Sequence, residues 1–260
     1  MSSYLAHRRK GFRGAAPPLP THWWNLDDDG TWSDDGELAD ANWDLTENNS
    51  TVATSAVGPN SQTVATFDGD SSGVNEPYLD RTDVGWDGAA DGGDYPFTLS
   101  IWFNLNSLPS TVLYPIMWRN FTLTEGGIGI YAISSTSGDY RIANVVRDTS
   151  GNRADCDTDD ADHEGTFNQW HHAVSVWDGT TLRLYIDGTE IETDTNATVG
   201  TFDTTSMLFA IGTGPNKGTS VQYMNGEIGM VGIWDKALDQ SDIDTLYNSG
   251  NGNQYADIWG

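Results

Sequence analysis

The chain has 260 residues, including 29 glycines and 11 tryptophans, and a formal net charge of -26. A chain of this length can bury a full core, and β-sandwiches of this size are commonly one domain. The acidic surface repels nucleic-acid phosphates and anionic membranes, no apolar run is long enough to span a bilayer, and the single Cys156 excludes an intrachain disulfide.

Residues 1–20 are predicted to form a basic arm. Arg8, Arg9, Lys10 and Arg13 precede any acidic residue, and the prolines of Ala-Ala-Pro-Pro-Leu-Pro favour an extended spacer. Two interpretations stay open: a disordered tail, or an anchor that orders on the acidic surface of a partner. Because no run has signal-peptide length, we expect a soluble protein without an export signal.

Residues 21–260 are predicted to form one all-β domain, because short β-prone runs alternate with turn-rich segments. The first runs are HWWNL and TVATFDGD. In the clearest strand, residues 97–105, apolar side chains alternate and share one face, which belongs in a core: Phe97, Leu99, Ile101, Phe103 and Leu105.

The segment WHHAVSVWDGTTLRLYIDGTEIETD is predicted to be a three-stranded meander. It contains the hairpin signals Asp178-Gly179 and Asp187-Gly188. Alternation is expected to turn one set of side chains inward: Val174, Val176, Leu182, Leu184 and Ile186. It is expected to turn another set outward: Trp177, Arg183 and Tyr185. Further strands are predicted at MLFAIGT and QYMNGEIGMVGIW.

One short helix is predicted near the C-terminus. Asp239 is the expected N-cap, with Asp242 in the capping-box position, and Ile243 and Leu246 form an apolar stripe. Gly250 suits the left-handed C-terminal position. This helix is expected to cover an edge of the sandwich.

Several segments occur in an order that resembles the laminin-G-like domains of the concanavalin A-like lectin/glucanase superfamily. They are HWWNL, NWDLTENNSTVATSAVGPNSQTVATFDG, YLDR, FTLSIWFNL, WHHAVSVWDGTTLRLYIDGTEI, FAIG and GEIGMVGIWDKALDQSDIDTLYNSG. The resemblance covers about Thr21 to Gly252. It implies a jelly-roll β-sandwich of two antiparallel sheets, glycan or protein binding, often a structural calcium ion, and no catalysis by itself.

The start MSSYLAHRRKGFRG is similar to the basic starts of laminin-G-like structural proteins in tailed phages of marine bacteria. That similarity implies a virion protein that decorates head or tail. The arm would contact other virion proteins, the sandwich would bind cell-surface glycans, and the chain would be an oligomer within the assembly. The alternative is an extracellular glycan-binding module, or a degenerate glycosidase, of a marine or halophilic microbe.

No catalytic residue is predicted. Glycosidases need two carboxylates at a defined separation, and Gly229 stands where relatives with glucanase activity place an acid after Glu227. Glu190, Glu192 and Asp194 alternate, but charges on an edge-like strand are more typical of a solvated face that prevents edge pairing.

Metal and histidine sites are weakly indicated. His171 and His172 are adjacent on a strand, so they face opposite sides and cannot chelate one ion together. The run from Asp155 to Glu164 lacks the glycine and glutamate of an EF-hand loop and is predicted to be a mobile acidic loop. The resemblance places the calcium candidate at the FDGD turn, on Asp68 and Asp70.

The glycan-binding candidates are Trp102, Trp177 and Tyr185, because sugars present apolar C–H faces that stack on exposed aromatic rings. Strand parity places all three opposite the predicted core residues. A second interpretation, favoured because large exposed apolar patches are uncommon, is that loops cover this face and the aromatics form a second apolar layer.

Overall fold

The computed structural model describes residues 16–27, 32–37, 44–48, 51–55, 57–69, 77–81, 95–108, 114–122, 126–135, 139–158, 164–200, 209–213 and 223–259, with backbone only for 60 and 114–122. Four predicted anchor residues lie outside this part of the chain: Arg8, Arg9, Lys10 and Arg13. Asp70 of the calcium candidate also lies outside it.

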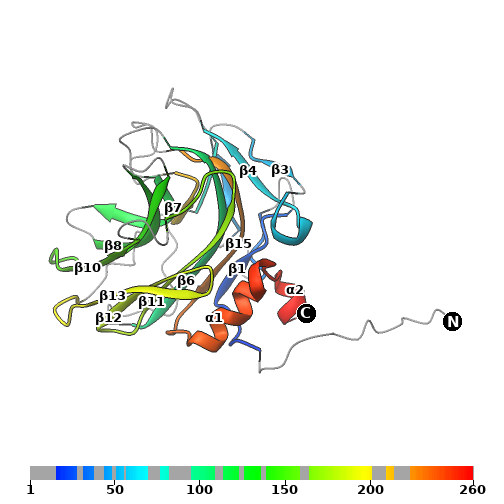
Figure 1. The fold of residues 1–260 in the computed structure, drawn as a ribbon. Coiled ribbons are helices and arrows are strands. Elements are labelled where there is room, and N and C mark those ends of the chain that lie inside the picture. The colour runs from blue at the N-terminus through cyan, green and yellow to red at the C-terminus, as the bar shows by residue number, and fades with distance from the viewer. Residues whose placement is uncertain are drawn as a thin grey trace.

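The described chain consists mainly of strands (Figure 1). Their bounds are β1 His22–Trp24, β2 Thr46–Asn48, β3 Ala53–Ser55, β4 Val64–Asp68, β5 Tyr78–Arg81, β6 Phe97–Ser107, β7 Tyr114–Thr122, β8 Gly126–Ser134, β9 Tyr140–Arg147, β10 Arg153–Asp157, β11 Trp170–Trp177, β12 Thr181–Ile186, β13 Thr189–Thr195, β14 Phe209–Ile211 and β15 Asn225–Trp234. The helical elements are η2 Pro59–Ser61, α1 Gln240–Tyr247, η4 Asn248–Gly250 and α2 Tyr255–Ile258.

The strands form two antiparallel sheets. In the described residues, sheet 1 has eight strands in the order β13-β12-β11-β6-β15-β4-β3, with β1 also paired to β15. Sheet 2 has seven strands in the order β10-β9-β8-β7-β14-β5-β2. In each sheet a run of consecutive strands, β13-β12-β11 or β10-β9-β8-β7, lies beside strands that are distant in the chain. The predicted jelly-roll sandwich is confirmed.

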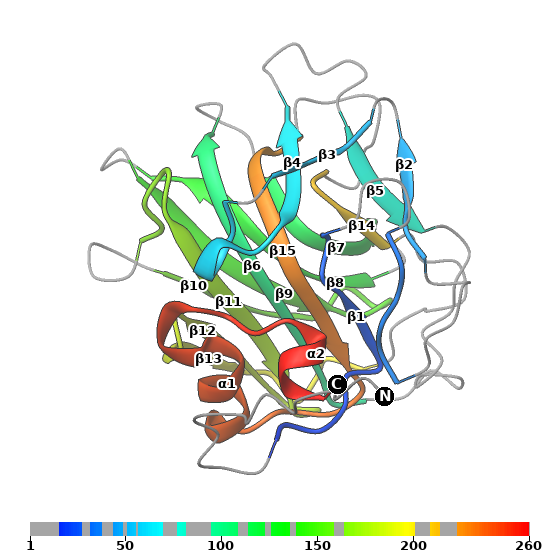
Figure 2. The ribbon, with the colours of Figure 1, turned by 90° about the vertical axis from the view of Figure 1, so that its right-hand side faces the viewer.

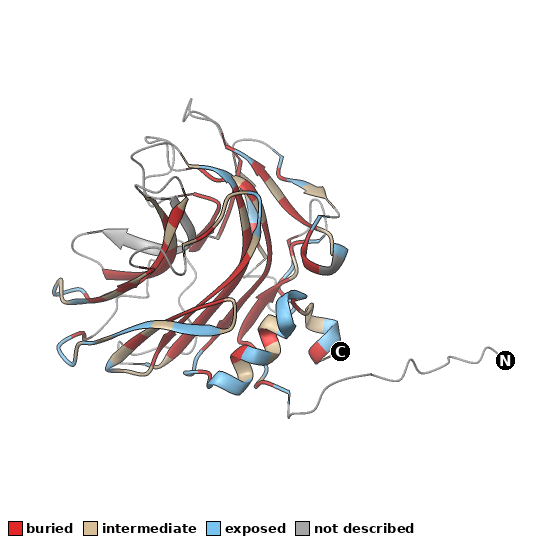
Figure 3. Ribbon diagram, viewed as in Figure 1, coloured by how far each residue is buried: buried red, intermediate tan, exposed pale blue. Residues whose placement is uncertain are grey.

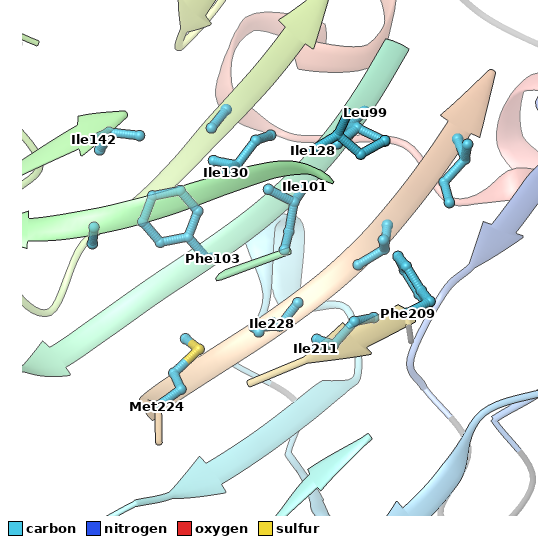
Figure 4. Packing of buried hydrophobic residues seen from close by; sticks show 14 of the residues in the cluster. Leu99, Ile101, Phe103, Ile128, Ile130, Ile142, Phe209, Ile211, Met224 and Ile228 are labelled. Atoms are coloured by element: carbon cyan, nitrogen blue, oxygen red, sulfur yellow. The ribbon is translucent and has the colours of Figure 1, made fainter. Parts of the chain in front are cut away.

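The main core lies between the two sheets. Leu99, Ile101 and Phe103 of β6 face Ile128 and Ile130 of β8, and the burial of both inner faces is nearly complete (Figures 3 and 4). This confirms the inner face predicted for residues 97–105. Strands β7 to β10 were not predicted, and Asp155 and Asp157 belong to β10 rather than to the predicted acidic loop.

A second apolar layer covers the outer face of sheet 1, where α1 and α2 lie (Figure 2). Trp102 and Tyr185 belong to this layer, together with Val174 and Val176. Trp177 instead faces the core between the sheets, opposite Leu182 on β12. The predicted parity of β11 is therefore wrong, because both faces of this strand are apolar and alternation alone does not distinguish them.

The C-terminal helix α1 has the predicted start. Asp239 and Asp242 form a capping box, and Ile243 and Leu246 are buried against the sheet. The helix ends at Tyr247, and Asn248 takes the left-handed position two residues before Gly250, which also has a positive φ. The second helix, α2, was not predicted.

The proline segment of the predicted arm packs on the domain. The indole nitrogens of Trp234 and Trp259 donate hydrogen bonds to the carbonyl oxygens of Pro18 and Pro17, both at 2.9 Å. Residues 16–20 are therefore part of the fold rather than a free spacer. In the described part of the chain, no helix has both the length and the hydropathy of a membrane span.

Candidate functional site

The three predicted sugar-stacking residues are buried. Trp102 is 2% exposed, Trp177 0% and Tyr185 5%. Trp102 stacks on His172 at a centroid distance of 4.9 Å and on Tyr247 at 5.8 Å. The expectation of an exposed platform at these positions is wrong, because the C-terminal helix covers the rings of Trp102 and Tyr185 and sheet 2 covers that of Trp177. The alternative expectation, a second apolar layer, holds for Trp102 and Tyr185.

The adjacent histidines face opposite sides, as predicted. The backbone N–H of Thr166 donates to His171 Nε2 at 3.0 Å, so Nδ1 carries the proton and donates to Asp187 at 2.9 Å. Both ring nitrogens of His171 are therefore engaged. Such a ring is a structural support, without a lone pair for a metal or a substrate proton.

His172 is enclosed in the second apolar layer. Its Nε2 lies 2.8 Å from Ser100 Oγ, and both residues are buried. Burial lowers the pKa of His172 to about 4, so the ring is neutral at neutral pH. Ser100 and His172 have the contact of the serine–histidine pair in a catalytic triad. The likeness is geometric only, because both side chains are buried beneath the helical layer, where no substrate reaches them.

The alternating acids of β13 join the edges of the two sheets. Glu192 accepts a hydrogen bond from the backbone N–H of Asp157 at 2.6 Å, and Asp194 accepts one from the N–H of Asp155 at 3.0 Å. Glu190 accepts from the Tyr185 hydroxyl at 2.7 Å. These contacts assign the three carboxylates to edge protection and to packing.

A different group of polar residues lies on the outer face of sheet 1. On this face α1 and α2 lie over one part of the strands and the segment around η2 over another (Figure 2). We call this polar group the polar patch; its members are Thr66, Asn104, Asn106, Trp170, Asn225 and Glu227. Strand register brings the central four into one row across β4, β15, β6 and β11: Thr66, Glu227, Asn104 and Trp170. Each is partly exposed.

Among the described residues, two oxygen atoms at the centre of the polar patch are buried and have no hydrogen-bond partner. They are Glu227 Oε2 and Asn104 Oδ1, on directly opposed residues of β15 and β6. Burial raises the pKa of Glu227, and a hydrogen bond from the Asn106 side chain opposes this shift. Since buried acceptors normally have partners, the arrangement is typical of a site that receives donors from a ligand.

Trp170 adds an aromatic ring beside these acceptors. It lies opposite Asn104 on the neighbouring strand, and its indole N–H donates to the Val57 carbonyl oxygen at 2.8 Å. This hydrogen bond holds the ring in place, and Val57 is itself 52% exposed. The polar patch thus combines a fixed ring, an apolar neighbour and hydrogen-bonding groups, the features that sugar recognition requires.

Gly229 explains why the polar patch has one carboxylate and not two. It follows Glu227 on the same face, and a Cβ atom there would lie 2.5 Å from Val64 Cγ1. An acidic side chain would collide with β4. A side chain at position 229 would therefore require the Val64 side chain to shift, which is a physical reason for the glycine noted in the sequence.

The polar patch was not predicted from the sequence, because only the neighbours of Glu227 along the chain were considered. Its neighbours in the sheet, Thr66 and Asn104, are far away in the sequence. The signal was nevertheless present in residues 97–107, whose outward positions change from Trp102 to Asn104 and Asn106. That change from aromatic to amide marks the place where the second apolar layer ends. Asp68 of the calcium candidate lies opposite Asn225, at the exposed end of β4.

The described residues contain no group of three His, Cys, Asp or Glu side chains placed to hold a metal ion. Asp68 lies beside the amide of Asn225, and an oxygen donor set of this kind has the chemistry that calcium prefers. The described part of the site is too small to complete a calcium coordination shell.

Two antiparallel sheets with a helical layer on one outer face define a lectin-like β-sandwich. Residues 80–244 match the family described as the concanavalin A-like lectin/glucanases superfamily, and the chain belongs to that superfamily. No curated protein sequence matches the chain.

Solved structures share this fold at low sequence identity. The binding domain of botulinum neurotoxin serotype G has 13% identity and a TM-score of 0.63, with 88% of this chain and 50% of that chain covered. The binding domain of Paraclostridial Mosquitocidal Protein 1 has 16% identity and a TM-score of 0.64, with 89% of this chain and 52% of that chain covered. The chain thus spans about half the length of these binding domains.

A third similar structure is matched over its full length. Domain 4 of AbnA, an extracellular arabinanase from Geobacillus stearothermophilus solved in complex with arabinotriose, has 16% identity and a TM-score of 0.61. The match covers 92% of this chain and 100% of that domain. At such identities the likeness shows the fold.

Proposed function

We propose that this chain is a non-catalytic module that binds glycans through the polar patch. The observation that carries the proposal is the pair of partnerless buried acceptors, Glu227 Oε2 and Asn104 Oδ1, beside the fixed ring of Trp170. Sugar hydroxyls supply the missing donors, and a pyranose face packs on the ring. The arabinotriose complex of AbnA domain 4 supports the idea that this fold holds oligosaccharides.

A glycan array followed by calorimetry tests the proposal. The double variant Asn104→Ala, Asn106→Ala removes two amides from the polar patch, and we expect it to weaken binding at least about tenfold. Thr193→Ala, an exposed change on β13 of the same sheet, is the matched control. A wild-type chain that binds no glycan, or a double variant that binds as tightly as the control, contradicts the proposal.

We further propose that the module is part of a tailed-phage virion, anchored by Arg8, Arg9, Lys10 and Arg13 on an acidic partner protein. The docking of Pro17 and Pro18 by two indoles supports this, because it fixes the point from which the basic arm leaves the domain. Deletion of residues 2–14 leaves these contacts in place. We expect the deletion to preserve the fold and abolish co-sedimentation with particles; normal incorporation would overturn the anchor.

A structural calcium ion at Asp68 and Asp70 also stays a proposal. Calcium that binds only the folded chain raises its melting temperature. We expect a chelator to lower the melting temperature of the wild type and to leave that of Asp68→Asn, Asp70→Asn unchanged. A wild-type melt that is insensitive to chelator contradicts a structural ion.

A further inference from the structure

The polar patch holds two buried acceptors that have no hydrogen-bond partner among the described residues. Glu227 Oε2 and Asn104 Oδ1 lack partners, and their residues are directly opposed on β15 and β6. Side chains in such cross-strand pairs lie about 5 Å apart at their Cβ atoms. One ligand group that carries several hydrogens can therefore bridge both oxygens once it displaces the atoms that bury them.

Two donors of the polar patch, on Asn106 and Trp170, are already engaged. The amide of Asn106 donates to Asn225 Oδ1 at 3.2 Å, and a side-chain hydrogen bond also links Asn106 to Glu227. The indole N–H of Trp170 is bound to Val57. A ligand that brings further acceptors, such as a carboxylate or a sulfate, finds no donor among these groups.

The charge balance points in the same direction. Among the described residues, no cationic side chain contributes to the electrostatics of Glu227, and the whole chain carries a formal charge of -26. A ligand that covers this carboxylate removes more water from an unpaired charge, which is unfavourable unless the ligand supplies a positive group. Neutral hydroxyls donate hydrogen bonds to the carboxylate but bring no positive charge to offset its loss of water.

We propose that the group which enters the polar patch is a protonated amine, so that the preferred ligands are glycans with unacetylated amino sugars. An ammonium group has three donors: one for Glu227, one for Asn104 and one for solvent. The sugar ring then lies toward Trp170. This inference rests on the proposed glycan-binding function and names its ligand class.

A hard cation is the competing occupant of an oxygen-rich site. Calcium requires six to eight oxygen ligands in general, and the two partnerless oxygens of the polar patch supply a small part of that number. The three N–H donors of an ammonium group satisfy both partnerless oxygens without additional ligands from the protein. Titration with calcium chloride in the absence of sugar distinguishes the two occupants.

The test is calorimetry with three soluble probes: a glucosamine trimer, its fully N-acetylated form, and sialyllactose. We expect the wild type to bind the glucosamine trimer on the order of tenfold more tightly than the acetylated trimer, and sialyllactose least of all. Glu227→Gln keeps the shape and the Asn106 contact. It is expected to abolish the preference for the amine, so that the two trimers bind with affinities equal to within about threefold.

Glu37→Gln is the matched control, because it removes one exposed carboxylate outside the polar patch. A preference that survives in Glu227→Gln and in Glu37→Gln alike would come from the overall charge and would overturn the inference. Equal binding of the acetylated and free-amine trimers, or binding of calcium alone at the same site, would also overturn it. If the wild type binds no glycan, the proposed function itself fails.

Discussion

Glu227 is a carboxylate that the fold half-buries and leaves without a cationic partner among the described residues. Its pKa is raised by burial, so the folded chain holds the proton more tightly than the unfolded chain does. The stability linked to this proton is fully present below the unfolded pKa of about 4.3 and is lost as pH rises through the folded pKa. At neutral pH the ionised side chain therefore costs stability.

We predict that Glu227→Gln stabilises the free protein at pH 7. Because the side chain is partly exposed, solvent screening limits the gain to less than about 1 kcal/mol. The gain should vanish near pH 4, where both states of the wild type are largely protonated. Urea denaturation at the two pH values measures it; a destabilised variant at pH 7, or an equal gain at both pH values, would contradict the role of burial.

Trp102 is a buried packing residue of the second apolar layer. An exposed tryptophan at the same position would suit sugar stacking, so exposure decides between the two roles. Trp102 lies beneath α1, stacked on His172 and Tyr247. We predict that Trp102→Ala lowers the free energy of unfolding by about 3 to 5 kcal/mol, the usual cost of emptying an aromatic site in a core. Chemical denaturation measures this.

Trp170 is the matched comparison for Trp102. Its ring is partly exposed in the polar patch, so Trp170→Ala should cost less stability and should weaken glycan binding. If Trp102→Ala changed stability by less than about 0.5 kcal/mol, as surface substitutions do, the second apolar layer would not contribute as described.

At the scale of elements, β10 and β13 close one end of the sandwich without a backbone ladder between them. Two carboxylates of β13 accept hydrogen bonds from two backbone N–H groups on the free edge of β10. Neither edge is then available to pair with another chain. The predicted protection of the edge by these acids thus consists of two hydrogen bonds to β10.

We predict that Glu192→Ala and Asp194→Ala each cost about 1 kcal/mol and accelerate hydrogen exchange at the amides of Asp157 and Asp155, respectively. Exchange measured by NMR tests each pair. Glu190→Ala is the control, because its carboxylate binds Tyr185 within the same sheet. Unchanged exchange at both amides would show that the two carboxylates do not join the edges.

At the scale of the whole molecule, the net charge of -26 must oppose compaction. Carboxylates more than about 10 Å apart still repel one another at low salt and are screened at high salt. We predict that raising sodium chloride from about 10 mM to about 500 mM increases the melting temperature by several degrees. Sucrose at equal osmolality is the control, and a melting temperature that falls with added salt would contradict the prediction.

Much of the fold could be predicted from local patterns. The hairpin turns at Asp178-Gly179 and Asp187-Gly188 are present, and Asp187, Gly188 and Gly179 all have positive φ. The capping box of α1 is also as predicted. Strands β7 to β10 were missed, because their glycines and charged residues obscure the alternation that revealed β6.

The site was harder to predict than the fold. The burial of Trp102, Trp177 and Tyr185 depends on what covers each face of a strand, and parity does not contain this information. Aromatic residues suit both a sugar platform and a packed layer. Only the positions of α1 and sheet 2 distinguish these two roles.

The sequence by itself determined where the chain turns, which face of β6 enters the core and where α1 begins, because turn sterics, alternation and capping act between near neighbours. The tertiary structure decided which outer faces are covered, that Glu227 lies opposite Asn104, and that the acids of β13 bind β10. These contacts join segments far apart in the chain. Strand register and layer packing set them, and both arise only when the whole sandwich closes.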